Sequence, residues 1–487
     1  MKKFQLLSIL LSCTLFLSTC LTIPVSANSA QTSWSGVSST GAVCQAENSP
    51  LEVKKEVLTF DLPDFPYPDE PSMDLTEYHN SFTAEYTFFN PSEYTITASL
   101  LFPFGTWPSY VSSYDDSNYA TFYADLEKYN VTVDGVPIEK EIRHSLNSYD
   151  FVLDRHLKQL QDHYREDDFF KPDIPVTHQV FQYSQISESD LWTASIGITM
   201  DATEDFCLYF PEQNSLWENE DGTFSPRSSL MDTHGTLNLY TIGELPEDPP
   251  EWEIQDGEGN PISGKIKMTS SETMTLEEMV LQNWTETCGI SKIDWYNAML
   301  EQLILTRESC PYKGLIPTDY WIMQPMNDLL MCWYSYEITL EPGQELVNTV
   351  TAPLFPDIDL SNSAPVCNYE YLLSPAKTWN SFGSLDIRIR TPYCLIESTL
   401  GDWDLDEEGY FLHLDGLPDK ELALVLSTDA IPDPSNYSGV TVYGEKENDY
   451  TEDTSFSPIL IVAVVVFVLL AFVLLLLFLR KRKIQKK

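Results

Sequence analysis

The sequence feature that most constrains this chain is a long apolar segment near its C-terminus. Residues 459–479 form a run of 21 residues without a charged side chain. A helix of that length rises about 30 Å, which matches the hydrocarbon core of a bilayer. Residues 480–487 include six basic side chains, and a basic flank favours the cytoplasmic side. We therefore expect a single-pass type I protein of the cell membrane, with a basic cytoplasmic tail and an ectodomain outside.

The N-terminal segment predicts export. Residues 1–27 begin with a basic pair, continue with an apolar stretch and end in Val25-Ser26-Ala27, which is typical of a signal peptide and its cleavage site. Residues 28–50 are rich in small polar residues, so we expect a flexible leader. Residues 433–458 are polar and acidic, which predicts a stalk between the folded part and the membrane.

The exported part is strongly acidic. Without the two lysines of the signal and the six basic residues of the tail, 20 Lys and Arg stand against 74 Asp and Glu, a balance of −54. Such a surface repels nucleic acid, so we expect no nucleic-acid partner. It attracts divalent metals, cationic peptides or basic surfaces, or it serves solubility alone. Seven cysteines remain after the signal, without a CxxC spacing, and their pairing cannot be read from the sequence.

Hydrophobic periodicity predicts a mainly β protein with short helices, of the α+β class. Alternating patterns indicate a β-rich domain over 51–250, with a helix near 150–165, and a second β-sandwich-like unit over 311–432. A Pro-, Gly- and acid-rich stretch begins the region between them, 251–310, which we expect to be a connection with two helices. In that region Thr275 and Glu278 fit a capping box.

Two turns predict β-hairpins. Alternation in 82–88 and 96–100 surrounds a turn-forming stretch at 90–93, which favours an antiparallel hairpin. Asp134-Gly135 fits the two-residue loop of a second hairpin.

Residues 401–416, GDWDLDEEGYFLHLDG, hold aspartates at 402, 404 and 406 and invite comparison with a calcium loop. An EF-hand loop needs glycine at its sixth position and glutamate at its twelfth, but the chain has Glu407 and His413 there. We therefore expect the aspartates to lie on the solvent face of a hairpin that turns at 406–409. A looser surface calcium site stays open as the alternative.

The sequence signals for other functional sites are weak. His156 and His163 lie on one side of a helix by spacing, and with Glu166 they could bind a metal, although bordering an apolar stripe explains them as well. Trp107, Trp217, Trp252 and Trp379 could stack on sugars, but we expect core packing to be the role of most of them. The sequence lacks the common motifs of catalytic nucleophiles, of nucleotide-binding loops and of dinucleotide-binding folds. We predict no catalytic residue, no cofactor and no metal site.

Three segments resemble a known group of proteins: AEYTFFNPSEYTITASLLFPFG, VTVDGVPIEKEIRHSL and YEYLLSPAKTWNSFGSLDIRI. Together they resemble uncharacterised exported proteins of Gram-positive bacteria that have a signal peptide, a β-rich ectodomain and one C-terminal span. The resemblance extends over much of 55–430 and implies a bacterial surface protein. It implies no activity, so no residue role follows from it.

The sequence as a whole favours a membrane-anchored extracellular protein that acts in binding or in organising the envelope, with a protein or envelope component as its partner. Two alternatives stay open. One is a membrane-tethered hydrolase that acts on wall or glycan substrates through a pair of carboxylates. The other is a subunit of a membrane complex that contacts its partners through the span.

Overall fold

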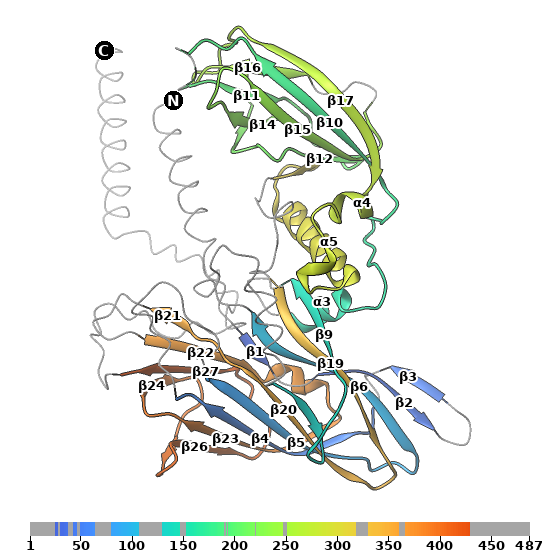
Figure 1. Ribbon diagram of the computed structural model, residues 1–487, viewed down its shortest axis with the longest axis vertical. Helices are drawn as coiled ribbons and strands as arrows, with labels where there is room; N and C mark the ends of the chain where they lie inside the picture. Colours follow the sequence, from blue (N-terminus) through green and yellow to red (C-terminus); the bar gives the residue numbers. More distant parts are fainter. Residues whose placement is uncertain are drawn as a thin grey trace, which may run out of the picture. The chain divides into compact units, whose positions relative to one another are not determined.

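The computed structural model confirms the coarse fold class, because the described residues are mainly β with a few short helices (Figure 1). It describes residues 25–27, 30–37, 42–45, 49–63, 79–106, 129–146, 152–188, 191, 193–219, 221–246, 251–317, 330–359 and 366–428. The predicted stalk, span and tail lie outside these residues, as does most of the predicted signal. No helix in the described ranges has the length and apolarity needed to cross a membrane.

Three sheets form the first packing unit, which we call the terminal sandwich. Its eight-stranded sheet has the order β25-β26-β23-β4-β5-β20-β7-β8. These strands are β4 (Glu52–Asp61), β5 (Ser81–Phe89), β7 (Val131–Val133), β8 (Val136–Pro137), β20 (Glu345–Pro353), β23 (Ser381–Arg390), β25 (Asp404–Leu405) and β26 (Tyr410–Leu414). Side chains on one face of this sheet pack against the other two sheets.

The two smaller sheets of the terminal sandwich have five strands each among the described residues. One contains β3 (Ala42–Gln45), β2 (Ala30–Val37), β6 (Thr95–Thr106), β19 (Leu330–Leu340) and β9 (Glu141–Leu146), in that order. The other contains β1 (Val25–Ala27), β22 (Val366–Leu372), β27 (Leu422–Ser427) and β24 (Cys394–Ser398), with β21 (Asp357–Asp359) also on β22. A 3-10 turn, η6 (Ser374–Thr378), follows β22.

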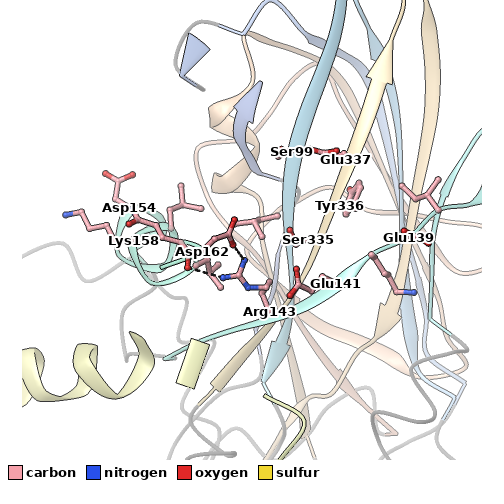
Figure 2. Close-up of a pocket in the computed structure, with 16 residues that line it drawn as sticks. Ser99, Glu139, Glu141, Arg143, Asp154, Lys158, Asp162, Ser335, Tyr336 and Glu337 are labelled. Atoms are coloured by element: carbon pink, nitrogen blue, oxygen red, sulfur yellow. Dashed lines mark hydrogen bonds and ion pairs between the residues drawn. The ribbon is translucent and has the colours of Figure 1, made fainter. Parts of the chain in front are cut away.

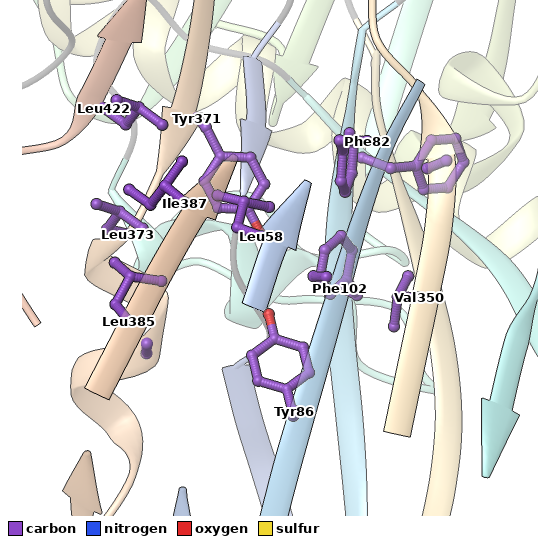
Figure 3. Packing of buried hydrophobic residues seen from close by; sticks show 14 of the residues in the cluster. Leu58, Phe82, Tyr86, Phe102, Val350, Tyr371, Leu373, Leu385, Ile387 and Leu422 are labelled. Carbon is purple, nitrogen blue, oxygen red and sulfur yellow. The ribbon is translucent and has the colours of Figure 1, made fainter. Parts of the chain in front are cut away.

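Aromatic rings join the layers of the terminal sandwich (Figure 3). Phe82 of β5 stacks on Phe102 of β6 with ring centroids 5.7 Å apart. Phe82 also contacts Tyr371 of β22 edge-on at 5.4 Å. Each aromatic ring buries a large apolar area, so these contacts between sheets account for much of the stability of this core.

The second packing unit, which we call the inserted unit, lies between β9 and β19 in the chain. One sheet has the order β17 (Lys265–Thr275), β10 (Pro175–Ser184), β15 (Gly235–Gly243), β12 (Phe206–Tyr209) and β18 (Leu315–Ile316). The other has the order β13 (Ser215–Glu218), β14 (Phe224–Ser229), β11 (Ser195–Ile198) and β16 (Trp252–Gln255). Its helices are α3 (Leu153–Gln159), α4 (Leu276–Val280), the 3-10 turn η4 (Glu286–Cys288) and α5 (Lys292–Ser309).

The helix starts follow the sequence signals. Thr275 and Glu278 make both bonds of a capping box at the start of α4, as predicted. The side chain of Ser291 accepts the backbone N–H of Asp294 at the start of α5. Helix α3 ends at Gln159, so it is shorter than the helix predicted near 150–165.

The strand pairing groups the chain differently from the sequential division into 51–250, 251–310 and 311–432. Strand β4 pairs in parallel with β23, and β5 pairs with β20, so described segments from before and after the inserted unit build the terminal sandwich together. Alternation shows which face of a strand is buried but does not specify its partner. The segment 28–50, for which the sequence predicts a flexible leader, contains β2 and β3, which extend the sheet from β6.

One predicted hairpin is confirmed and the other is wrong. Asp134 and Gly135 have φ angles of 50° and 75° in the loop between β7 and β8, as the two-residue turn requires. Residues 82–88 and 96–100 are strands, but β5 and β6 belong to different sheets. The buried side chain of Asn90 donates to Leu340 O at 3.1 Å and to Tyr94 O at 2.8 Å, which fixes an arch between the sheets.

Candidate functional site

An open groove of about 1190 Å³ lies beside β9 in the described part of the protein (Figure 2). Strands β6, β9 and β19 form one wall, and helix α3 with the residues that follow it forms another. Most side chains in the groove are polar. Such a recess suits a polar, extended ligand better than a small apolar one.

The charged residues in the groove are mostly acidic. The acidic residues are Glu139, Glu141, Asp154, Asp162 and Glu337, and the basic ones are Lys140, Arg143 and Lys158. The side chain of Asp162 is 92% exposed and accepts a hydrogen bond from Arg143 at 2.8 Å. Since Arg143 is already paired, the groove favours ligands with positive charge.

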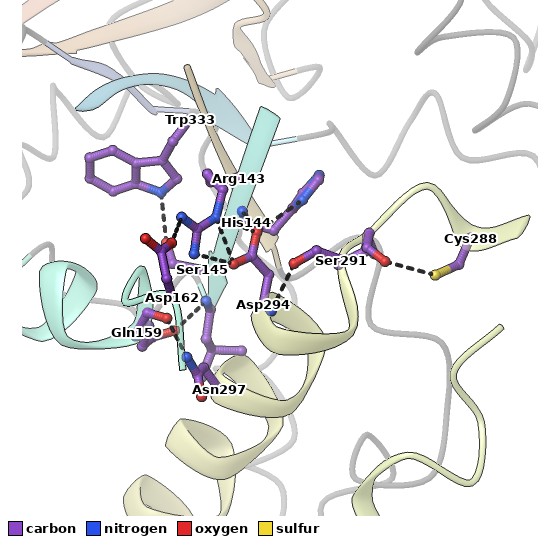
Figure 4. A network of polar contacts seen from close by, with 12 residues as sticks. Arg143, His144, Ser145, Gln159, Asp162, Cys288, Ser291, Asp294, Asn297 and Trp333 are labelled. Carbon is purple, nitrogen blue, oxygen red and sulfur yellow. Dashed lines mark hydrogen bonds and ion pairs between the residues drawn. The ribbon is translucent and has the colours of Figure 1, made fainter. Parts of the chain in front are cut away.

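A buried ion pair holds the groove side of β9 against helix α5 (Figure 4). Nε of Arg143 donates to both carboxylate oxygens of Asp294, at 2.9 and 3.2 Å. The Arg143 side chain is 7% exposed and Asp294 is fully buried. The backbone N–H of His144 also donates to Asp294, at 2.8 Å. Burial raises the pKa of Asp294, while Arg143 and the His144 N–H oppose that effect.

Further polar contacts continue this network toward α3. The Gln159 side chain accepts the backbone N–H of Leu146 at 2.7 Å. Asn297 of α5 donates to the carbonyl of Gln159 at 2.7 Å and accepts the N–H of Arg165 at 2.8 Å. The Leu146–Gln159 bond joins β9 to α3, and the Asn297 bonds join α5 to α3 and to the residues after it. The groove wall therefore depends on the inserted unit and the terminal sandwich together.

A serine and a histidine meet inside the network. Trp333 Nε1 donates to Ser145 Oγ at 2.7 Å, and Ser145 Oγ lies 2.9 Å from His156 Nδ1. All three side chains are enclosed, so a substrate cannot reach the Ser145 hydroxyl in this conformation. Burial lowers the pKa of His144 and of His156 to about 3, because a buried imidazole resists protonation.

The histidine metal site predicted as an option is not assembled. His156 is buried on α3, whereas His163 and Glu166 lie beyond the end of the helix and are exposed. Spacing places two residues on one face only while the helix continues. Among the described residues, no three His, Cys, Asp or Glu side chains are grouped to hold a metal ion.

The acidic stretch 401–416 forms the expected hairpin. Strands β25 and β26 pair antiparallel, and the N–H of Asp406 bonds to the carbonyl of Gly409 at 2.9 Å. The aspartates at 402, 404 and 406 are exposed. Leu405 of β25 is 71% exposed.

The tryptophans proposed as sugar platforms mainly serve packing. Trp379 is buried against Phe88, with ring centroids 4.7 Å apart. Trp252 packs on Phe181 and Phe210. Trp217 lies over the Arg227 guanidinium at 5.0 Å, and Trp107 lies outside the described residues.

The cysteines described by the structure are Cys207, Cys288, Cys310, Cys332, Cys367 and Cys394. Four of them are buried, where cysteine behaves as a small apolar residue. Burial raises the pKa of the Cys207 thiol to about 11. A thiol with so high a pKa is a poor nucleophile at neutral pH.

Sequence reasoning missed the buried ion pair that supports the groove wall. Arg143 and Asp294 are 151 residues apart in the chain, and neither belongs to a recognisable motif. A local signal existed for Asp294, because it follows the cap Ser291 by three residues. That signal indicates a helix start and does not indicate a partner on β9.

Comparisons with known proteins do not indicate a function for this chain. No family model matches the chain, and no curated protein matches its sequence. Among solved structures, the chain is similar to a protein of Legionella pneumophila that is described provisionally as nutrient binding, with a TM-score of 0.30 and 9% identity. That match covers 83% of this chain and 71% of the other. A score this low supports no conclusion, so function has to be argued from the groove itself.

Proposed function

We propose that this protein is a membrane-anchored extracellular binding protein, in which the groove beside β9 receives a cationic, extended ligand such as a basic peptide. The open, polar groove of about 1190 Å³ with five acidic side chains is the observation that carries this proposal. The acidic balance of the exported part supports it, because long-range attraction raises the local concentration of cations. The two β-sandwich-like units would form the ectodomain and 459–479 the single anchor.

The anchor can be tested by truncation. Ending the chain after residue 458 removes the apolar run and the basic tail. We expect the truncated protein in the culture medium and the full chain in the membrane fraction, because the apolar run that the truncation removes is long enough to span the bilayer. A control that removes only 480–487 should stay with the membrane. Equal membrane retention of both truncated chains would contradict the proposed anchor.

The ligand class can be tested by reversing groove charges. Hexalysine is titrated onto the full-length protein in mild detergent, with hexaglutamate as the probe of opposite sign. The double substitution Glu139→Lys and Glu141→Lys should weaken hexalysine binding at least tenfold, which corresponds to about 1.4 kcal/mol. Both side chains are exposed, so the fold should tolerate the change.

A matched control separates the groove from the acidic surface in general. Asp402→Lys with Asp404→Lys reverses the same number of charges on the exposed hairpin, away from the groove lining. We expect less than a twofold effect from this pair. Equal losses in the two variants would show that hexalysine binds the surface at large, and the groove proposal would fail.

A further inference from the structure

Strand β17 is a long strand at the edge of its sheet. It has 11 residues and pairs with β10 along one side (Figure 1). Within the described part of the chain, no strand pairs with its other side. Nearly all of its side chains are exposed or half-buried. An open edge of this length presents a row of backbone N–H and C=O groups that can pair with another strand.

A bulge decides which β17 side chains share a face. Val180 lies opposite Ser270 and Phe181 lies opposite Met268, so Thr269 is the extra residue. With Thr269 left out of the alternation, Lys267, Ser270 and Glu272 point to the same side of the sheet. Both charge signs are therefore present on one face, on either side of the middle of the strand.

We propose that two copies of this protein pair antiparallel through β17, with Ser270 on the two-fold axis. In this register Lys267 of each copy lies opposite Glu272 of the other, so the same ion pair forms twice. Ser270 is the midpoint of β17, so the whole strand takes part. A two-fold interface requires a self-complementary patch, and opposite charges across antiparallel strands are favourable.

Charge also explains why the copies would meet at β17. The strand carries Lys265, Lys267 and Glu272, a net charge of +1, in a chain with a formal net charge of −46. Acidic surfaces of two copies repel each other elsewhere. The Glu272 side chain lies 3.3 Å from His178 but is 66% exposed, so it can still reach a lysine of the second copy.

Disulfide trapping tests the register. Residues directly opposite in an antiparallel pair have Cβ atoms about 4.5–5.5 Å apart, within disulfide reach. In the full-length protein in mild detergent, Ser270→Cys should give a reducible dimer under mild oxidation, with peptide mapping to locate the bridge at 270. Met268→Cys is the matched control, since position 268 faces Ser271 of the second copy and should cross-link at least fivefold less. Equal yields from the two variants would overturn the register.

Charge exchange tests the interface without added cysteines. Light scattering of the unmodified full-length protein should show a dimer. Lys267→Glu alone and Glu272→Lys alone should each raise the dimer dissociation constant at least tenfold, because each places like charges opposite one another. The double exchange should restore dimerisation. A monomer for the unmodified protein, as expected if the lysines and the bulge protect the edge, would refute the proposal.

Discussion

Replacing Arg143 with methionine should lower the free energy of unfolding by about 3–5 kcal/mol, because it leaves a buried carboxylate without its partner. Asp294 is fully buried and takes two hydrogen bonds from Arg143 Nε. Urea unfolding of the full-length protein in mild detergent, followed by tryptophan fluorescence, measures the loss. Since the ion pair joins β9 to α5, the inserted unit and the terminal sandwich should also unfold less cooperatively.

Two further variants make this prediction specific. Arg143→Met combined with Asp294→Asn removes both charges, and it should recover at least half of the lost stability. Lys313→Met breaks an ion pair in which the Lys313 side chain is 62% exposed and the Glu204 side chain 73%, and it should lower the free energy of unfolding far less, because solvent screens an exposed pair. If Arg143→Met cost no more than Lys313→Met, the buried pair would not hold the groove wall.

Acid should destabilise the protein below about pH 6.5 through two buried histidines. Burial lowers the pKa of His144 and His156 from 6.5 to about 3. The folded state keeps both rings neutral while the unfolded chain binds protons, so this stability is present above pH 6.5 and is lost as the pH falls. Each histidine contributes about 1.4 kcal/mol per pH unit. At pH 4.5 the two together should cost about 5 kcal/mol.

Glu370 gives the opposite pH dependence of stability. Burial, with Asp357 and Glu421 nearby, raises its pKa from 4.5 to about 8. The folded state keeps Glu370 protonated, so its stability contribution is full below pH 4.5 and is lost as the pH rises toward 8. Stability should therefore peak near pH 6.5. Glu370→Gln should flatten the decline above pH 6.5 and should steepen the rise in stability between pH 4.5 and 6.5, because Glu370 opposes the histidines over that range.

Urea unfolding at pH 4.5, 5.5, 6.5 and 7.5 measures both effects. His156→Gln should lower the acid slope by about 1.4 kcal/mol per pH unit, because glutamine keeps an acceptor for Ser145 and does not titrate. The exposed His234 is the matched control, and His234→Gln should leave the slope unchanged. A slope that is the same in all three proteins would contradict the assignment to the buried histidines.

The sequence by itself determined the local structure well. Periodicity of two indicated strands at 82–88 and 96–100, and both form. The capping box at Thr275, the turn at Asp134-Gly135 and the hairpin at 401–416 also form as predicted. These features depend on residues close in the chain, whose turn and cap chemistry acts over a few bonds. The apolar run 459–479 likewise predicts an anchor from length alone, and it stays a prediction.

Only the tertiary structure decided which strands pair and which polar side chains meet. Residues 52–61 and 381–390 lie side by side as β4 and β23, although the sequence suggested separate domains. Arg143 and Asp294 meet across 151 residues, and His156 and Gln159 of α3 are buried where an apolar stripe was expected. An alternating pattern indicates that one face of a strand is buried. The pattern does not depend on which strand lies beside it, so it does not reveal the partner. A buried polar residue is tolerated only beside its partner, and that proximity exists only after the chain has folded.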